Sequence, residues 1–195
     1  MNRGTAILIA LVALVGAAGC NDPTSPSTGR VEVLLTDAPI DLDTVNAVNV
    51  TLDKIILFGS GEMVEDEDGL EMDRPTVEDG EGLMLDLLEF QNGQTITIAN
   101  LEVTPGTFQK VRMYIREASL AMDDPNDPMA EIQVPVDVPS GKVDIPVSFE
   151  VSGGETLEIV LDFDAALSVQ VNETSGGNKE YILRPVITPV GVTRQ

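Results

Sequence analysis

Residues 143–151 read VDIPVSFEV, and this stretch decides the fold class. Val143, Ile145, Val147, Phe149 and Val151 give five consecutive matches to a period of two. Such a period is typical of a β-strand with one buried face, because successive side chains point to opposite sides. The same period recurs from residue 30 onward, and no segment long enough for a regular helix shows the helical period. The sequence therefore predicts an all-β domain.

Shorter alternating stretches predict the other strands. Apolar residues alternate over 48–52, but the phase then slips to Ile55 and Leu57, which predicts a β-bulge near 53 and 54. Gly or Pro stands at most junctions between the stretches, as turns require. We expect about eight strands in a single antiparallel β-sandwich over 30–195. The remaining strands are expected within 31–35, 95–98, 110–116, 157–171 and 181–192.

Prolines and one ambiguous stretch refine this arrangement. Pro135, Pro146, Pro185 and Pro189 fall within strand-like runs. Because proline cannot donate a hydrogen bond to a neighbouring strand, these positions predict sheet edges. Residues 83–90, LMLDLLEF, fit either a strand or a single helical turn, and the pattern alone does not decide between them.

The composition excludes several classes of function. The chain has 195 residues, with Lys+Arg 11 against Asp+Glu 33, and a formal net charge of -22. Nucleic acids are bound through basic side chains, so no nucleic-acid partner is expected. The absence of His and the single Cys exclude Ser-His-Asp and Cys-His nucleophilic sites, His-ligated zinc and an intrachain disulfide. What remains is carboxylate chemistry, cation binding through oxygen ligands, or no chemistry.

The first residues have the pattern of an export signal. Arg3 precedes an apolar run over 6–15, and small residues follow over 16–19, directly before Cys20. These small residues resemble a bacterial lipoprotein cleavage site, at which the cysteine is acylated, for example with palmitate, and becomes the N-terminus. We therefore predict a signal peptide over 1–19, lipidation at Cys20 and a Pro/Ser/Thr tether over 20–29. A transmembrane helix and an ordinary secreted protein with a stray thiol are the alternatives.

A long acidic segment interrupts the strand pattern. Residues 62–81 hold ten carboxylates and a single base, Arg74. Glu65, Asp66, Glu67 and Asp68 provide the oxygen atoms that a hard cation such as calcium prefers, but their spacing does not match an EF-hand loop. The simpler interpretation is a solvated acidic insertion loop.

Three further aspartates form the main candidate site. Asp37 lies in the turn Thr-Asp-Ala-Pro over 36–39, and Asp162 and Asp164 lie in the Leu-Asp-Phe-Asp run over 161–164. Strand alternation predicts Asp162 and Asp164 on one face, where two like charges need a cation, a base or amide donors between them. A surface ion network with basic residues satisfies this need, and the candidates are Arg112, Arg116 and Arg184. The sharper hypothesis makes Asp37, Asp162 and Asp164 ligands of one calcium ion.

Several motifs together resemble the bacterial lipoprotein family known as domain of unknown function 4382. The resemblance covers residue 30 to about residue 192. It implies a transthyretin-like or immunoglobulin-like β-sandwich in the cell envelope, and it brings no established activity, ligand or catalytic residue. The motifs that carry it are 36–39 (TDAP), 86–88 (DLL), 91–93 (QNG), 105–108 (PGTF), 111–112 (VR), 161–164 (LDFD), 168–169 (SV) and 181–186 (YILRPV).

These observations favour a non-enzymatic envelope lipoprotein anchored to a membrane, whose β-sandwich binds a partner or has a structural role. The expected partners are an envelope protein, a cation or a surface polymer. Calcium binding by clustered carboxylates is the alternative, and a carboxylate-based hydrolase is a further one, since paired carboxylates can cleave glycosidic bonds. The acidity also suits a salty habitat, where screening relieves the repulsion between like charges.

Overall fold

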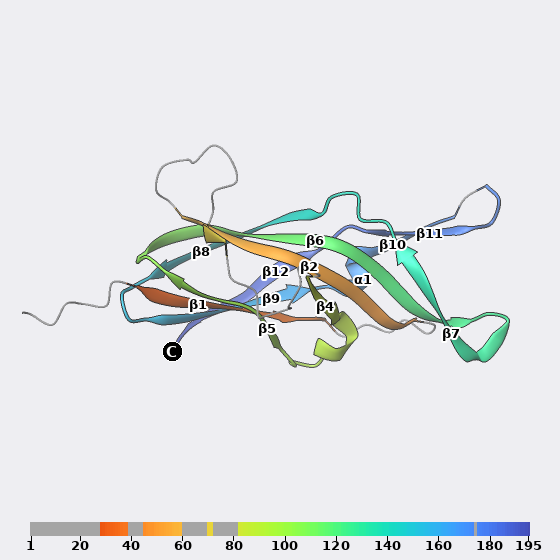
Figure 1. Ribbon diagram of the computed structural model, residues 1–195, viewed down its shortest axis with the longest axis horizontal. Helices are drawn as coiled ribbons and strands as arrows, with labels where there is room; N and C mark the ends of the chain where they lie inside the picture. The colour runs from red at the N-terminus through yellow and green to blue at the C-terminus, as the bar shows by residue number, and fades with distance from the viewer. Residues whose placement is uncertain (1–27, 39–44, 60–69, 72–81, 174) are drawn as a thin grey trace, which may run out of the picture.

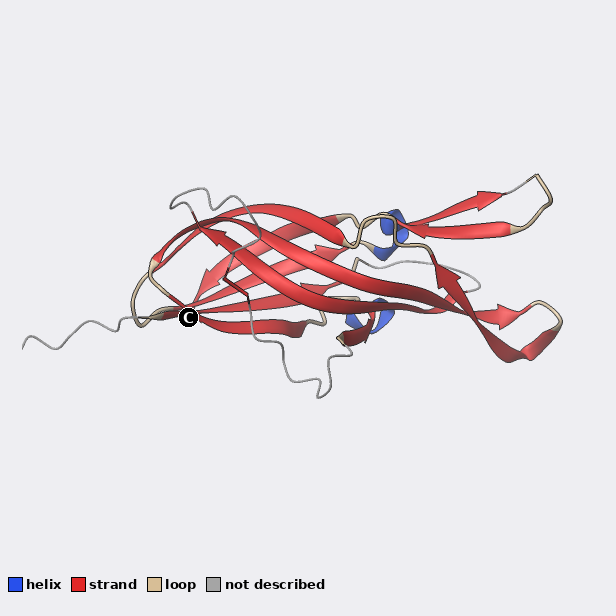
Figure 2. Ribbon diagram, turned by 45° about the horizontal axis from the view of Figure 1, so that its top comes forward, coloured by secondary structure: helices blue, strands red, loops and turns tan. Residues whose placement is uncertain are grey.

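The chain forms two packed β-sheets and a projecting hairpin, which confirms the all-β sandwich class (Figure 1; Figure 2). The computed structural model describes residues 28–38, 45–59, 70–71, 82–173 and 175–195. Within these residues, no helix is long and apolar enough to cross a membrane. Cys20, the signal and nearly all of the tether lie outside the described residues, as do Glu65, Asp66, Glu67 and Asp68 of the acidic segment.

The first sheet has the strand order β12-β9-β1-β5. Strand β1 (Gly29–Thr36) lies at its centre, antiparallel to β5 (Ile96–Val103) and parallel to β9 (Thr156–Phe163). Strand β12 (Ile187–Arg194) pairs with the far side of β9. The parallel β1–β9 pair departs from the wholly antiparallel arrangement that we expected. Because parallel strands end at the same edge, this pair brings residues after β1 close to residues after β9.

The second sheet is built around the long strand β6 (Gly106–Asp124). Strand β2 (Val45–Gly59) pairs along one side of β6, while β7 (Asp127–Val136) and β8 (Lys142–Val151) share its other side. The ladder between β2 and β6 skips Asp53, which confirms the predicted bulge. Strands β3 (Leu70–Glu71) and β4 (Leu83–Asp86) pair with the outer side of β2.

Apolar side chains from the facing sides of the two sheets form one continuous core. In β9 every second residue is buried, and β8 shows the same alternation from Ile145 to Val151. The rings of Phe108 and Phe149 stack inside, with their centroids 5.2 Å apart. The largest fully buried side chains are Phe163, Leu35, Ile56, Leu57, Leu87, Met113, Leu120, Ile145, Leu157, Ile159 and Leu161.

The prolines and the ambiguous stretch occupy positions that the sequence explains. Pro135 lies in β7, Pro146 in β8 and Pro189 in β12, and each of these strands lies at a sheet edge, as predicted. Pro185 instead lies between β11 and β12, outside any strand. Residues 83–90 form both predicted structures in succession, strand β4 and then the 3-10 helix η1 (Leu87–Phe90).

The molecule is elongated, and its two ends differ (Figure 1). Gly29, where β1 begins, and the C-terminal Gln195 lie at one end, since Arg30 bonds to Glu155 and Gln195 bonds to Thr156. At the other end two hairpins project, β6–β7 and β10–β11, which Figure 2 shows from a second side. Strands β10 (Val169–Glu173) and β11 (Lys179–Leu183) form a separate two-stranded sheet, connected to the end of β7 by backbone bonds at Asp137.

Candidate functional site

Asp37 is a buried carboxylate that joins three parts of the fold. It follows β1 directly and is 3% exposed. Its Oδ1 accepts a hydrogen bond of 2.9 Å from the amide of Ala165, and its Oδ2 accepts one of 3.4 Å from Nε2 of Gln91. Its own amide donates to the carbonyl of Phe90 at 3.0 Å. Asp37 therefore connects the end of β1 to η1 and to the short helix α1 (Ala165–Ser168).

Asp164 caps a helix instead of sharing a strand face with Asp162. The sequence predicted that the strand continues through 171, but β9 ends at Phe163 and Asp164 is the N-cap of α1. Its Oδ1 accepts a hydrogen bond of 2.8 Å from the amide of Leu167. Aspartate is favoured at an N-cap because its carboxylate accepts from the free amides of the first helical turn. This local preference overrides the alternation that the sequence suggested.

Asp162 provides the third carboxylate, and one of its oxygens is unsatisfied. It lies near the end of β9, opposite Thr36 on β1 and Thr188 on β12. Its Oδ1 is buried and has no hydrogen-bond partner. Burial, and then the nearby charge of Asp164, raise the pKa of Asp162, while a bond from the amide of Ala38 lowers it. We call Asp37, Asp162 and Asp164 the acidic corner.

Burial and neighbouring charges destabilise the ionised form of Asp37 in the acidic corner. Burial raises the pKa of Asp37 from its ordinary 3.8 to about 6, against the lowering effect of the bonds from Ala165 and Gln91. The charges of Asp162 and Asp164 raise it further. A carboxyl group with such a pKa changes from neutral to ionised at a pH only slightly below neutral. The structure thus brings Asp162 and Asp164 close enough to Asp37 for their charges to act on it.

Among the described residues, the predicted ion network does not form around the acidic corner, because two of its bases have other partners. Arg112 bonds to Asp144 through Nε at 2.5 Å and Nη2 at 3.0 Å, on the outer face of the second sheet. Arg116 pairs with Asp53 on the same sheet. At Arg184 the described contact is made by the main chain, whose amide donates to the carbonyl of Ser168 at 2.8 Å.

The acidic corner lacks the geometry of a preformed metal site. The described residues contain no group of three or more His, Cys, Asp or Glu side chains that could hold a metal ion. Both oxygens of Asp37 and one of Asp164 already accept hydrogen bonds from amide groups. The arrangement favours a proton on Asp37, and it fixes the ends of β1 and β9 by hydrogen bonds.

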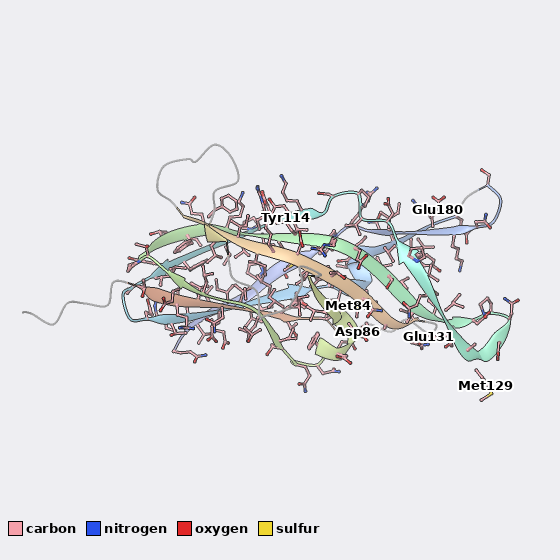
Figure 3. All side chains as sticks on the ribbon, in the orientation of Figure 1. Met84, Asp86, Tyr114, Met129, Glu131 and Glu180 are labelled. Carbon is pink, nitrogen blue, oxygen red and sulfur yellow. The ribbon has the colours of Figure 1, made fainter. Side chains whose placement is uncertain are left out.

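Sequence reasoning placed Asp86 and Ser168 within motifs but missed that their side chains stabilise the same region. Asp86, labelled in Figure 3, caps η1 with its Oδ1, which accepts from the amides of Leu88 at 3.1 Å and Val48 at 3.0 Å. Ser168 is fully buried, and its Oγ accepts from the amide of Val186 at 2.8 Å. An aspartate directly before a Leu-Leu pair is a recognisable N-cap signal. No local pattern would have identified the partner of Ser168.

The fold and the acidic corner together define a β-sandwich protein in which buried polar side chains connect the ends of strands by hydrogen bonds. A family model described as Domain of unknown function (DUF4382) matches residues 28–185, and the chain belongs to this family. No curated protein matches the chain, and no solved structure matches it. The matched range includes all three residues of the acidic corner, and also Asp86 and Ser168.

Proposed function

We propose that this chain is a lipid-anchored protein of a bacterial cell envelope, whose β-sandwich binds or positions a partner and catalyses no reaction. The predicted signal and Cys20 support the anchor. Strand β1 begins at Gly29, the last residue of the predicted tether, which fits a domain held close to a membrane.

One observation carries the non-enzymatic part of the proposal. Two carboxylates of the acidic corner, Asp37 and Asp164, and the neighbouring Ser168 each accept a hydrogen bond from a main-chain amide. Asp37 and Ser168 are also buried. Groups that are used in this way stabilise strand and helix ends, and burial restricts the access of a substrate to Asp37 and Ser168.

The polarity of the fold suggests how the protein would be oriented on the membrane. The end that carries Gly29 would face the membrane, and the two projecting hairpins would point away from it (Figure 1). Met129, near the tip of the β6–β7 hairpin, is 97% exposed and is labelled in Figure 3. The net charge of -22 makes a partner with a basic surface the most compatible one.

Replacing the lipidation residue tests the anchor. Wild-type protein and Cys20→Ser are expressed with a labelled fatty acid, and membranes are separated from the soluble fraction. We expect label and membrane retention for the wild type and neither for Cys20→Ser, while Ser25→Ala in the tether behaves as the wild type. Unlabelled wild-type protein in the cytosol with its leader intact would contradict the proposal.

Substrate panels test the absence of catalysis. The full-length protein is assayed with glycoside, ester and peptide substrates, and we expect no turnover above a heat-denatured sample. Turnover that is abolished by Asp162→Asn or Asp164→Asn would show that the acidic corner is catalytic.

Calcium binding at the acidic corner is the second candidate, and the buried, unpartnered Oδ1 of Asp162 favours it. A bound ion would stabilise the folded state by mass action. The test is a melting curve in millimolar calcium against sodium chloride of matched ionic strength. A calcium-specific rise that Asp162→Asn removes would support the site, and equal melting temperatures would exclude it.

A further inference from the structure

One long edge strand of the sandwich contains neither a proline nor a lysine. An exposed sheet edge offers unpaired N–H and C=O groups to any extended chain, and proteins block it with prolines, lysines or very short strands. Among the described residues of the two large sheets, β7, β8 and β12 each contain a proline. Strands β3 and β4 are two and four residues long.

Strand β5 is the exception. It is eight residues long, reads ITIANLEV over 96–103, and contains neither proline nor lysine. Within the described residues it pairs with β1 alone, so its second side forms the open edge of the first sheet. From Ala99 to Val103 its register with β1 is regular, which leaves five residues in a geometry suited to accept another strand.

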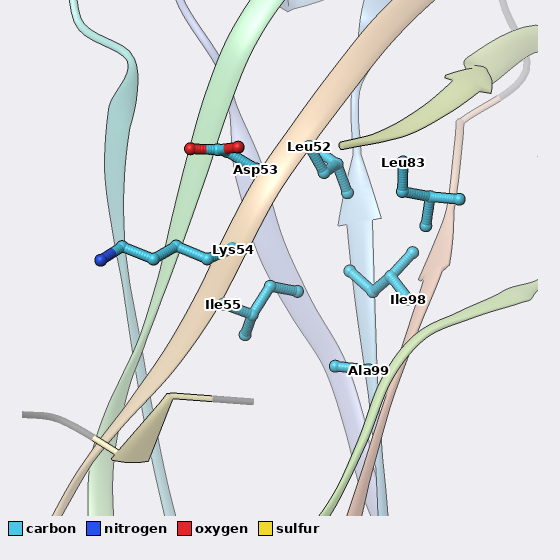
Figure 4. Close-up of a pocket in the computed structure, with 7 residues that line it drawn as sticks. All are labelled: Leu52, Asp53, Lys54, Ile55, Leu83, Ile98 and Ala99. Atoms are coloured by element: carbon cyan, nitrogen blue, oxygen red, sulfur yellow. The ribbon is translucent and has the colours of Figure 1, made fainter. Parts of the chain in front are cut away.

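A small apolar hollow lies beside this edge, between the two sheets (Figure 4). Ile98 and Ala99 of β5 line it together with Leu52 and Ile55 of β2 and with Leu83. Asp53 and Lys54 also border the hollow, but in Figure 4 their side chains point to the other side of β2. With a volume of about 10 Å³, the hollow has room for no more than a methyl group, such as alanine or valine presents, and excludes an aromatic ring.

A β-bulge in β5 creates this combination of edge and hollow. Val33 of β1 lies opposite Ala99, but Leu34 lies opposite Thr97, so Ile98 is an extra residue in the ladder. The bulge allows two consecutive side chains, Ile98 and Ala99, to be buried on the same side, where both line the hollow. Bulges commonly redirect side chains in this way beside binding sites.

We propose that the β5 edge is a docking site for an extended segment of another protein, which adds to the first sheet as a further strand. In this mode of recognition, main-chain hydrogen bonds provide affinity and a pocket for alternate side chains provides specificity. The inference deepens the proposed function, because it names the partner of the binding module as an extended peptide with alternating small aliphatic and basic residues.

Charge determines which extended chain fits. Glu102 of β5 is exposed and lies opposite Arg30 of β1, while Glu32 of β1 lies opposite Asn100, so this part of the edge carries two carboxylates and one base. Opposite charges on neighbouring strands are favourable, so lysine or arginine suits the side chains that face Glu102. A second copy of this chain is disfavoured, since it would bring another net charge of -22 and a second Glu102 to the same edge.

The probe is a capped eight-residue peptide of alternating valine and lysine with a fluorescent label, added to the full-length protein in detergent. We expect saturable binding by fluorescence anisotropy. A peptide with the same side chains but N-methyl groups on alternate amides loses ladder bonds and should bind at least about tenfold more weakly. A valine-glutamate peptide should bind more weakly than the valine-lysine peptide.

Two charge-reversal variants locate the site. Glu102→Lys should weaken binding roughly two- to five-fold, whereas Glu180→Lys, the same change on the exposed β11, should leave binding unchanged. Amide hydrogen exchange should slow over 99–103 when the peptide binds. Absence of binding at millimolar peptide, binding that N-methylation leaves unchanged, protection elsewhere, or dimers linked through β5 would each overturn the inference. Membrane retention by Cys20 is measured separately, so failure here and failure of the proposed function are distinguishable.

Discussion

Asp37→Asn offers the sharpest test of the acidic corner. Asparagine has nearly the same shape as aspartate, keeps an oxygen for the amide of Ala165, and can donate to Gln91 once that side chain turns its oxygen inward. The substitution therefore removes the titrating charge with little change in packing. Any pH-dependent difference between the variant and the wild type reports on this one carboxyl group.

The expected magnitude follows from the raised pKa. The folded protein holds the Asp37 proton with a pKa of about 6, against 3.8 ordinarily, so the folded state binds more protons than the unfolded state between these values. The resulting stabilisation is fully present below pH 3.8 and is lost as the pH rises through 6. Since one pKa unit corresponds to about 1.4 kcal/mol, the wild type should lose about 2.5 kcal/mol of unfolding free energy between pH 4 and pH 8 through this residue.

The assay is urea denaturation of both proteins at several pH values from 4 to 8. The unfolding free energy of Asp37→Asn minus that of the wild type should increase by about 2.5 kcal/mol over this range, because charge effects elsewhere in the molecule cancel in the difference. Gln91→Ala removes a bond that lowers the pKa of Asp37, so it should move the transition to higher pH. A difference that stays constant from pH 4 to pH 8 would refute the reasoning.

Two further predictions concern capping and backbone conformation. Ser168→Ala leaves the amide of Val186 without its acceptor and should lower the unfolding free energy by about 1–2 kcal/mol. The measurement is urea denaturation, and unchanged stability would show that this hydrogen bond contributes nothing. Gly82 and Gly93 have φ of 80° and 81°, but a Cβ would lie 2.7 Å from the carbonyl oxygen of Leu52 at Gly82 and would meet nothing within 4 Å at Gly93. Gly93→Ala should therefore cost about 1 kcal/mol and Gly82→Ala clearly more, and equal melting temperatures for the two variants would contradict this.

The strands were predictable wherever one face is buried and the other is solvated. Strand β8 and the 110–116 part of β6 alternate in the sequence as they do in the structure, because burial selects every second side chain. The bulge in β2 was visible for the same reason, since an extra residue changes the phase of the apolar positions. Pattern reasoning succeeds here because the information is local.

Long-range pairing was not predictable from such patterns. Nothing in residues 30–36 indicates that their partner is 156–162 or that the two run parallel. The convergence of Asp37 with Asp162 depends on that pairing, so the sequence suggested these residues as a group but not their geometry. The role of Asp164 was mistaken because a four-residue helix has no detectable period, whereas its capping aspartate has a clear local preference.

The central position of β1 has a consequence for how the protein matures. Arg30 lies near the beginning of the chain, yet one of its two neighbouring strands begins at Thr156. Contacts between such distant residues form slowly, because the intervening chain must first be ordered. We expect the first sheet to stay open until most of the polypeptide has been synthesised. In the export that we propose, such a delay would keep the chain loosely structured during its passage through a translocation channel, and folding would be completed on the far side of the membrane.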